Sequence, residues 1–377
     1  MRTQAILVIS IAVFAASQST GSEQSGSEPL SLEQVLTNTP QLSSLLQLFD
    51  RYPALLSSLN NTSNITVFAP INNALQSLID DAAITNRIAE PGFVEAVTRY
   101  HITKGAYFSS SFTLAPQFAL TMMGDEKYSS LVGGQRLILE QFSTRRGSLL
   151  VQGGSNEGHD IVQADTALAG GSVLHHIDGV LTLPANVSAT AVQYNLTSLV
   201  DALVSAGLSE TVDRSSKVTI FAPLNPAFSD VASVLRNLTA EDRAHIMRYH
   251  VVNGTVAYST ELNAGRQLQS SSGQILNITR SPNDRIFINS ARVISSDVLL
   301  SGGVLHIVDT VLNPNATLLP NYKESKSVPA FTAVPDANVV ANPDFSGAGL
   351  STGAKAGIGV GSHCSHRDCS GVDASPA

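Results

Sequence analysis

Apolar and polar residues follow the same pattern in two ten-residue stretches of the chain. Thr66–Leu75 reads TVFAPINNAL and Thr219–Phe228 reads TIFAPLNPAF, and six of the ten positions are identical. In each stretch two β-prone apolar residues precede a proline, which cannot donate to the ladder of a central strand. Asn72 and Asn225 follow, and an asparagine at this place can cap a new helix. The pattern predicts a strand, a corner and a capped helix, used twice.

Helical spacing flanks each copy of this unit. Apolar residues recur every three or four positions within Leu42–Phe49 and again within Phe93–Tyr100, which predicts amphipathic helices. The second of these helices ends at the pair Tyr100–His101, and its equivalent in the other copy ends at Tyr249–His250. That later helix begins at Thr239, which stands three residues before an acid, as in a capping box.

A second shared motif closes each copy. Val173–Leu181 reads VLHHIDGVL and Val304–Leu312 reads VLHIVDTVL. Before it, short apolar runs such as Gln274–Thr279 and Arg285–Asn289 flank turn residues, which predicts antiparallel strands. We therefore predict two α+β modules and a short linker. The modules are residues 30–184 and 191–315, and the linker is residues 185–190.

The two ends of the chain lack this pattern. A charged residue, a dozen apolar residues and then small residues are typical of a secretory signal peptide, here residues 1–17. The composition of residues 18–29 predicts a flexible leader. That of residues 316–377, rich in Pro, Gly and Ser, predicts a disordered tail. Within the tail, Ser351–Gly361 resembles the start of a lipid-anchor signal but lacks the hydrophobic stretch that such a signal requires. An anchor would therefore need a different C-terminus.

Composition indicates an extracellular setting. Charged residues make up 14% of the chain and the formal net charge is -8, without a basic run that would suggest nucleic acid. Polar surface must come largely from Ser, Thr and Asn. Behind a signal peptide, the N-x-S/T sequons of the chain are candidate N-glycosylation sites on exposed turns. Because Asn60 and Asn61 are adjacent, we expect one of the two to carry sugar. The expected sites are Asn61, Asn64, Asn186, Asn195, Asn237, Asn253, Asn277 and Asn315.

The order of the motifs resembles that of the fasciclin (FAS1) domain. An N-terminal helical segment, T-[VI]-F-A-P-x-N-x-A-[FL], a Tyr-His pair at a helix end and V-L-H-x-[IV]-D-x-V-L follow one another in both copies, over residues 30–184 and 189–315. The resemblance implies two tandem modules, each a β-sandwich-like wedge with helices packed on one side. It also implies an extracellular or cell-surface protein that acts in adhesion and in matrix or wall contacts, and not an enzyme.

The resemblance further implies two places of partner contact. Family adhesion sites resemble the Tyr-His region and an Asp-aliphatic segment just before the last motif. The residues at these places are Tyr100, His101, Tyr249, His250, Asp297, Val298 and Leu299. A structural role is the alternative at each of them, since Tyr and His at a helix end commonly pack and hydrogen-bond, and Asp297 can cap a short helical turn.

Two groups of side chains invite a chemical interpretation. His175, His176 and Asp178 stand close together, but a hydrolase also needs a serine within their reach, and no G-x-S-x-G elbow occurs. Cys364 and Cys369 lie beside two histidines, a set that can bind zinc or copper, form a local disulfide or be incidental to the tail. We expect no catalytic residue, no metal site and no cofactor.

These features predict a secreted glycoprotein that mediates adhesion or organises the cell surface, matrix or wall by binding. The expected partners are cell-surface or matrix proteins or glycans, with no nucleic acid, and membrane association only through an anchor on an alternative C-terminus. The alternative function is a soluble binder of a polysaccharide or a small apolar ligand. A hydrolase comes third, because it needs a cleft with convergent polar residues.

Overall fold

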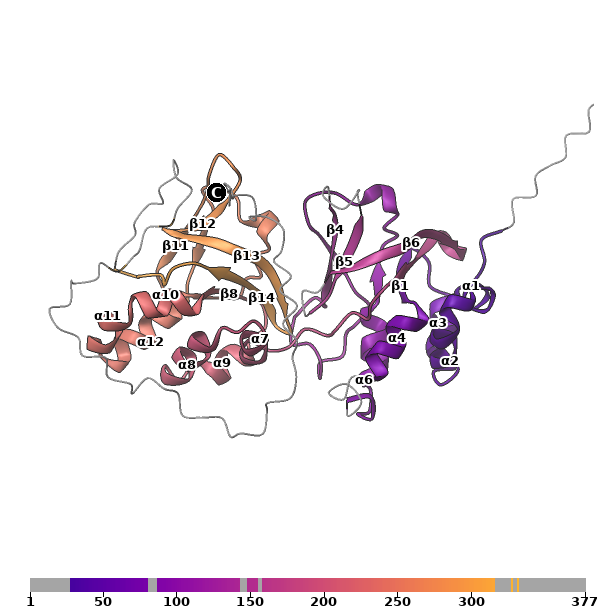
Figure 1. The fold of residues 1–377 in the computed structure, drawn as a ribbon, viewed down its shortest axis with the longest axis horizontal. Coiled ribbons are helices and arrows are strands. Elements are labelled where there is room, and N and C mark those ends of the chain that lie inside the picture. The colour runs from indigo at the N-terminus through magenta and orange to yellow at the C-terminus, as the bar shows by residue number, and fades with distance from the viewer. Residues whose placement is uncertain are drawn as a thin grey trace, which may run out of the picture.

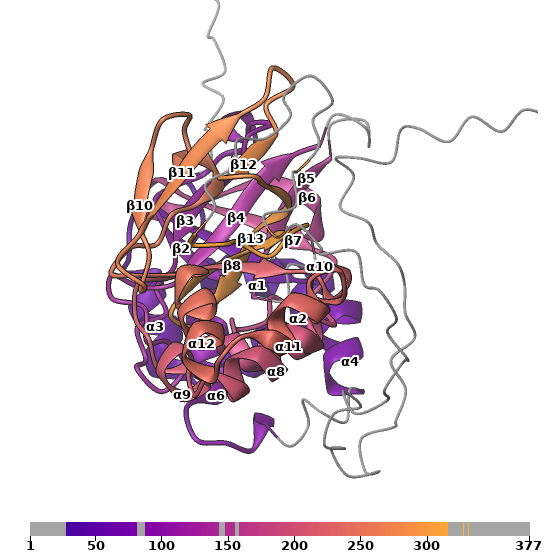
Figure 2. The same cartoon turned by 90° about the vertical axis from the view of Figure 1, so that its left-hand side faces the viewer.

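The computed structural model describes residues 28–80, 87–142, 148–154 and 158–315, together with Ser327 and Phe331. Two modules of the same architecture follow one another along the chain (Figure 1). Each has a seven-stranded sheet with helices gathered on one side. In Figure 2, turned by 90°, the helices of both modules again lie below the sheets. The predicted α+β class, with two tandem modules, is confirmed.

Module 1 places its two shared motifs side by side in the centre of its sheet. Its helical elements are α1 (Leu32–Asn38), η1 (Pro40–Leu42), α2 (Ser43–Phe49), α3 (Pro53–Asn60), α4 (Asn72–Ile79), α6 (Phe93–Tyr100), η2 (Ser109–Ser111) and η3 (Ala169–Gly171). Its strands are β1 (Ile65–Pro70), β2 (Ile102–Lys104), β3 (Gln117–Leu120), β4 (Arg136–Gln141), β5 (Leu149–Gln152), β6 (Gly158–Leu168) and β7 (Ser172–Ile177), in the order β2-β1-β7-β6-β5-β4-β3. The pair β1–β7 is parallel and the remaining pairs are antiparallel.

Module 2 repeats this order. Its helical elements are α7 (Val187–Gln193), α8 (Thr197–Ser205), α9 (Ser209–Asp213), α10 (Asn225–Asp230), α11 (Ala232–Asn237), α12 (Ala240–Tyr249) and η4 (Ser259–Glu261). Its strands are β8 (Val218–Pro223), β9 (Val251–Asn253), β10 (Gln267–Gln269), β11 (Ile275–Arg280), β12 (Ile286–Ile288), β13 (Ala291–Leu300) and β14 (Gly303–Val308), in the order β10-β11-β12-β13-β14-β8-β9. The predicted capping box at Thr239 and Asp242 is confirmed at the start of α12.

The central strands supply apolar side chains to both faces of each sheet. Along β1, Val67 and Ala69 enter the cluster beneath the helices, whereas Phe68 enters a second cluster on the other face. All six residues of β1 are buried, as expected of a central strand covered on both sides. Phe221 takes the place of Phe68 in module 2.

The asparagine after each corner proline caps a different helix from the one predicted. Helices α4 and α10 begin at Asn72 and Asn225 themselves, and neither has a side-chain cap. Asn72 Oδ1 instead accepts a hydrogen bond from the N–H of Ser44 at 3.0 Å, and Asn225 Oδ1 accepts from Ser198 at 3.0 Å. Ser44 and Ser198 are the second residues of α2 and α8, whose N–H groups have no partner within their own helix. The prediction is wrong about which helix is capped.

Two predicted boundaries also change. The linker is shorter than residues 185–190, because α7 begins at Val187, with Asn186 as its cap. Val187 and Ala191 are buried in the helix-side cluster of module 2, so that module begins at α7. In the predicted tail, Phe331 packs against the same cluster, since an aromatic ring gains free energy by burial. The signal peptide, most of the leader and the remainder of the tail, with both cysteines, lie outside the described residues.

Candidate functional site

The tyrosine of each Tyr-His pair ties a helix end to the sheet. Tyr100 and Tyr249 are 0% and 1% exposed. The hydroxyl of Tyr100 donates to the carbonyl of Arg136 in β4 at 3.1 Å, and that of Tyr249 donates to Ile275 in β11 at 3.0 Å. The repeated bond shows that Arg136 and Ile275 occupy equivalent places in the two modules.

The histidine of each pair joins the same helix end to the segment after the last strand. The Nδ1–H of His101 donates to the carbonyl of Val97 at 2.8 Å, and its Nε2 accepts from the N–H of Leu181 at 2.9 Å. His250 makes the equivalent two bonds at the same distances. Burial lowers the pKa of both histidines to about 4, so both rings are neutral at pH 7.

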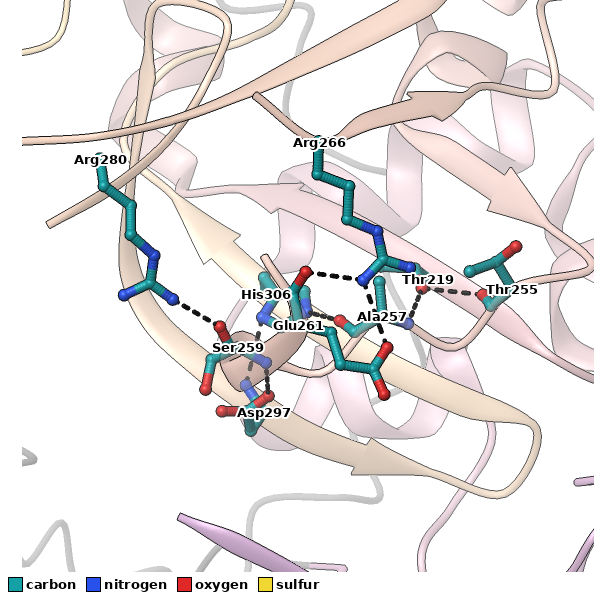
Figure 3. A network of polar contacts seen from close by, with 9 residues as sticks. All are labelled: Thr219, Thr255, Ala257, Ser259, Glu261, Arg266, Arg280, Asp297 and His306. Atoms are coloured by element: carbon teal, nitrogen blue, oxygen red, sulfur yellow. Dashed lines mark hydrogen bonds and ion pairs between the residues drawn. The ribbon is translucent and has the colours of Figure 1, made fainter. Parts of the chain in front are cut away.

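A second polar group lies behind the bulge of β13 in module 2 (Figure 3). Asp297 sits there with φ 64°, and its Oδ1 accepts from the N–H of Ser259 at 2.7 Å. The N–H of Asp297 donates to Nδ1 of His306 at 3.3 Å, and Nε2–H of His306 donates to the carbonyl of Ala257 at 2.8 Å. Because Ser259 is the first residue of η4, Asp297 in β13 caps this short helical turn. This is the capping role named above as the alternative to partner contact.

Further bonds hold the loop that leads to η4. Thr219 Oγ1 donates to the carbonyl of Thr255 at 2.9 Å, and Arg280 Nη2 donates to the carbonyl of Ser259 at 2.7 Å (Figure 3). These bonds come from β8 and β11, so two separate strands of the sheet hold the loop.

Module 1 builds the same group. Asp165 has φ 61° in β6 and accepts from the N–H of Ser109, the first residue of η2, at 2.8 Å. The N–H of Asp165 donates to His175 Nδ1 at 3.2 Å, and His175 Nε2–H donates to the carbonyl of Tyr107 at 2.8 Å. The group forms although the sequence before His175 differs from that before His306.

All seven candidate partner contacts are therefore buried in the molecule. Each of these side chains is 5% exposed or less, and the tyrosines, histidines and the aspartate have bonding partners within their own module. The geometry supports the structural role that was the alternative at these places. Contact of these residues with a partner stays a prediction.

The modules also contact each other, which no motif in the sequence predicts. The ring of Phe118 in β3 stacks on that of Tyr258 with centroids 4.0 Å apart, and Ile138 in β4 packs with Leu299 and Val304. Burial raises the pKa of Tyr258 to about 12, although Arg136 beside it acts in the opposite direction. The signal was present, because Phe118 and Ile138 occupy the outward positions of their strands, where alternation predicts polar residues.

The expected glycosylation sites lie mostly at the surface. Seven of the eight side chains are exposed, and Asn277 in β11 is half-buried. Asn64 and Asn195 have positive φ values of 54° and 56°, which is common for asparagine in turns. Accessible amide groups at turns are what the transfer of sugar requires; glycosylation itself stays a prediction.

An open cleft of about 310 Å³ lies between α6 and the segment after β3. Its lining includes Glu95, Arg99, Met122, Met123 and Asp125, and Glu95 pairs with Arg99 at 2.9 Å. Mixed charged and thioether groups do not form the apolar pocket that a small apolar ligand would need.

Asp178 and His175, two of the side chains considered above for hydrolysis, also make hydrogen bonds within the fold. Asp178 Oδ1 accepts from the N–H of Asp160 at 2.9 Å, and His175 belongs to the capping group above. Within the described ranges, no three His, Cys, Asp or Glu side chains gather as a metal site would require. Across the same ranges, no helix has the length and apolar character to cross a membrane.

The chain is similar to known proteins over both modules. The Fasciclin domain family matches residues 40–184 and 194–314. A "Fasciclin-like arabinogalactan protein" of Arthroderma benhamiae is 29% identical over 83% of this chain and 72% of its own length. "Fasciclin-like arabinogalactan protein CTB11" of Cercospora beticola is 31% identical over 75% of this chain and 76% of its own.

More distant similarities reach animal proteins. "Transforming growth factor-beta-induced protein ig-h3" of Sus scrofa is 36% identical over 31% of this chain and 17% of its own length. A solved FAS1 domain pair from the insect cell adhesion molecule fasciclin I covers 72% of this chain and 97% of its own, with 16% identity and a TM-score of 0.35.

Proposed function

Because the chain belongs to the Fasciclin domain family, we propose that it is a secreted, N-glycosylated protein that mediates adhesion or organises the cell surface, matrix or wall by binding. The family match over both modules carries this proposal. Relatives named as fasciclin-like arabinogalactan proteins cover most of the chain. The seven exposed sequon side chains support passage through a secretory pathway.

The bonding of the buried polar groups supports a function without catalysis. A general acid, base or nucleophile must reach its substrate. His101, His250 and His306 instead use both ring nitrogens for backbone bonds inside the modules. These histidines therefore stabilise the fold, and we place binding on the surfaces of the modules.

Binding of a small ligand is the second candidate function, and the cleft beside α6 is the observation that favours it. Its mixed lining, with charged side chains beside two methionines, suits a small polar ligand or a sugar better than a purely apolar one. An aromatic strip for stacking on sugar rings has little support, because in the described part of the chain Phe108 is the one aromatic ring more than a third exposed.

The location of the protein in the cells that produce it tests the main proposal. We expect full-length protein in the medium, wall or matrix fraction, with a loss of mass on treatment with an N-glycosidase. Deletion of the gene should reduce attachment of the cells to their substratum, and the wild-type chain should restore it. An unglycosylated cytosolic pool, or normal attachment without the gene, would overturn the proposal.

A further inference from the structure

The two modules contact each other through an apolar patch of limited size. Phe118 and Ile138 project from the outer face of β3–β4 in module 1, and Tyr258, Leu299 and Val304 meet them from module 2. Ile138 is 2% exposed and Leu299 is 1% exposed. An isoleucine on an outer strand face is this well buried because the second module covers it.

Hydrogen bonds fix the orientation of this contact. The carbonyl of Ser301, in the turn between β13 and β14, accepts from the N–H groups of Ser130 and Leu131 at 3.0 Å each. It also accepts from Nε2 of Gln135 at 2.8 Å, and the Gln135 side chain is 1% exposed. Gly302 follows, where a Cβ atom would lie 2.8 Å from Oγ of Ser130 in module 1 and 1.9 Å from the carbonyl oxygen of Ser215 in its own module, so a larger residue would not fit there.

The contact is of the head-to-tail kind. The outer face of β3–β4 in one module meets the turn end of β13–β14 in the next, so different surfaces of the repeated unit are joined. Such a contact leaves one complementary surface free at each end and can continue into an open series. A chain built from such modules can therefore bind further copies of itself through its two ends.

Among the described residues, no second strand face covers the turn end of module 1. Phe108 precedes Ser109 as Tyr258 precedes Ser259, and Ala167 pairs with the start of β7 as Leu299 pairs with β14. Phe108 is 41% exposed, whereas Tyr258 is 6% exposed. An aromatic ring at the equivalent place is thus available to a second molecule.

The strand face at the other end of the chain differs in chemistry. In β3–β4, Phe118 lies opposite Ile138; in β10–β11, Gln267 lies opposite Asn277. The equivalence of β4 and β11 follows from the shared tyrosine bond described above. Gln267 Nε2 donates to Asn277 Oδ1 at 2.9 Å, so one hydrogen bond already links the two amides. Burying them under another module would remove their water without adding apolar contact.

We propose that the outer face of β10–β11 is a polar cap that ends the head-to-tail series and keeps the chain a closed two-module unit. The expected sugar on Asn277 projects from the same face and adds bulk to the cap. Only this addition rests on the proposed function, because the amide pair is present with or without glycosylation.

The variant Q267F/N277I tests the cap by giving module 2 the apolar pair of module 1. The full chain is produced in a glycosylating and in a non-glycosylating host, and its weight-average mass is measured by sedimentation over a range of concentrations. We expect the wild type to keep the mass of one chain from both hosts, and the variant to rise toward multiples of it. Adding F108D, on an exposed side chain, should return the variant to the mass of one chain.

A matched control is Q193F/N237I, which makes the same two kinds of substitution, and removes one sequon, at exposed positions on α7 and α11. It should keep the mass of one chain. The proposal is overturned by a Q267F/N277I variant that is folded by circular dichroism yet stays a single chain, by association that F108D does not reduce, or by equal association of the control. An absence of sugar in the glycosylating host would count against the proposed function alone.

Discussion

The two modules agree in their interior and differ on their outer faces. Inside, His101 and His250 make equivalent pairs of hydrogen bonds. Asn72 caps α2 in module 1, and Asn225 caps the equivalent helix α8 in module 2. Each of these side chains bonds to backbone groups at a helix end or after the last strand, so a substitution would remove a bond from a backbone donor that is buried or partly buried. The need to pair these backbone groups therefore keeps the same residues at these interior positions in both modules.

The outer faces carry no such requirement. Gln267 stands where module 1 has Phe118, and Asn277 stands where it has Ile138. These positions need only suit what covers them: another module in one case, and water or sugar in the other. Residues can change there without cost to the fold.

One interior position departs from this agreement. His176 in β7 is 0% exposed, and neither of its ring nitrogens has a hydrogen-bond partner. Ile307 occupies the equivalent place in β14, because His306 precedes it as His175 precedes His176. Module 1 thus buries a polar ring where module 2 buries an aliphatic chain.

The largest expected effect concerns the pH dependence that the modules share. His101 and His250 titrate near pH 6.5 when unfolded and near pH 4 when folded. Below pH 6.5 the unfolded chain binds protons that the folded chain excludes, so stability present above this pH is lost as the pH falls toward 4. Each histidine should remove about 3 kcal/mol of the free energy of unfolding. Urea denaturation from pH 7 to pH 4 measures this loss.

The variant H250Q separates the titration from the bonds. Glutamine keeps a donor and an acceptor but does not titrate, so the variant should lose stability at pH 7 and show a smaller loss between pH 6.5 and pH 4. An unchanged pH dependence would show that the buried histidine of module 2 is not responsible, and the interior of the two modules would then differ more than their bonds indicate.

Exchanging the residues at the equivalent positions 176 and 307 should have a smaller effect on stability. H176I removes an unpartnered buried ring and should raise the free energy of unfolding by about 1–2 kcal/mol. The reciprocal I307H places such a ring in module 2 and should lower it by about 1–3 kcal/mol. Urea denaturation at pH 7.5, where an unfolded histidine is mostly neutral, measures both changes. Destabilisation by H176I would mean that module 1 uses the ring in its packing.

Sequence reasoning predicts the fold better than it predicts the use of individual side chains. The repeat, the strand-corner-helix unit and the closing motif follow from local patterns, because alternation and helical spacing act over a few residues. The contacts of Asp297 and Gln135 join elements distant along the chain, and no local pattern encodes them. Burial of the Tyr-His pairs is hidden for the same reason: the covering strands come later in the sequence.

The capping asparagines show the limit most clearly and give the smallest expected effect. N225A should remove the acceptor for the Ser198 N–H and lower the free energy of unfolding by about 1 kcal/mol, and N72A should do the same in module 1. N225D keeps the acceptor but loses the bonds that Nδ2 donates to Asn195 and Thr197, so it should fall between N225A and the wild type.

The control for these variants is N237A, at an exposed asparagine, which should change stability by less than about 0.5 kcal/mol. Urea denaturation of all four variants at pH 7 gives the comparison. Equal losses for N72A and N225A would show that the cap acts across the fold in the same way in both modules. A loss confined to one of them would mean that the shared motif, identical in sequence at this asparagine, does different work in the two modules, and that even the interior has begun to diverge.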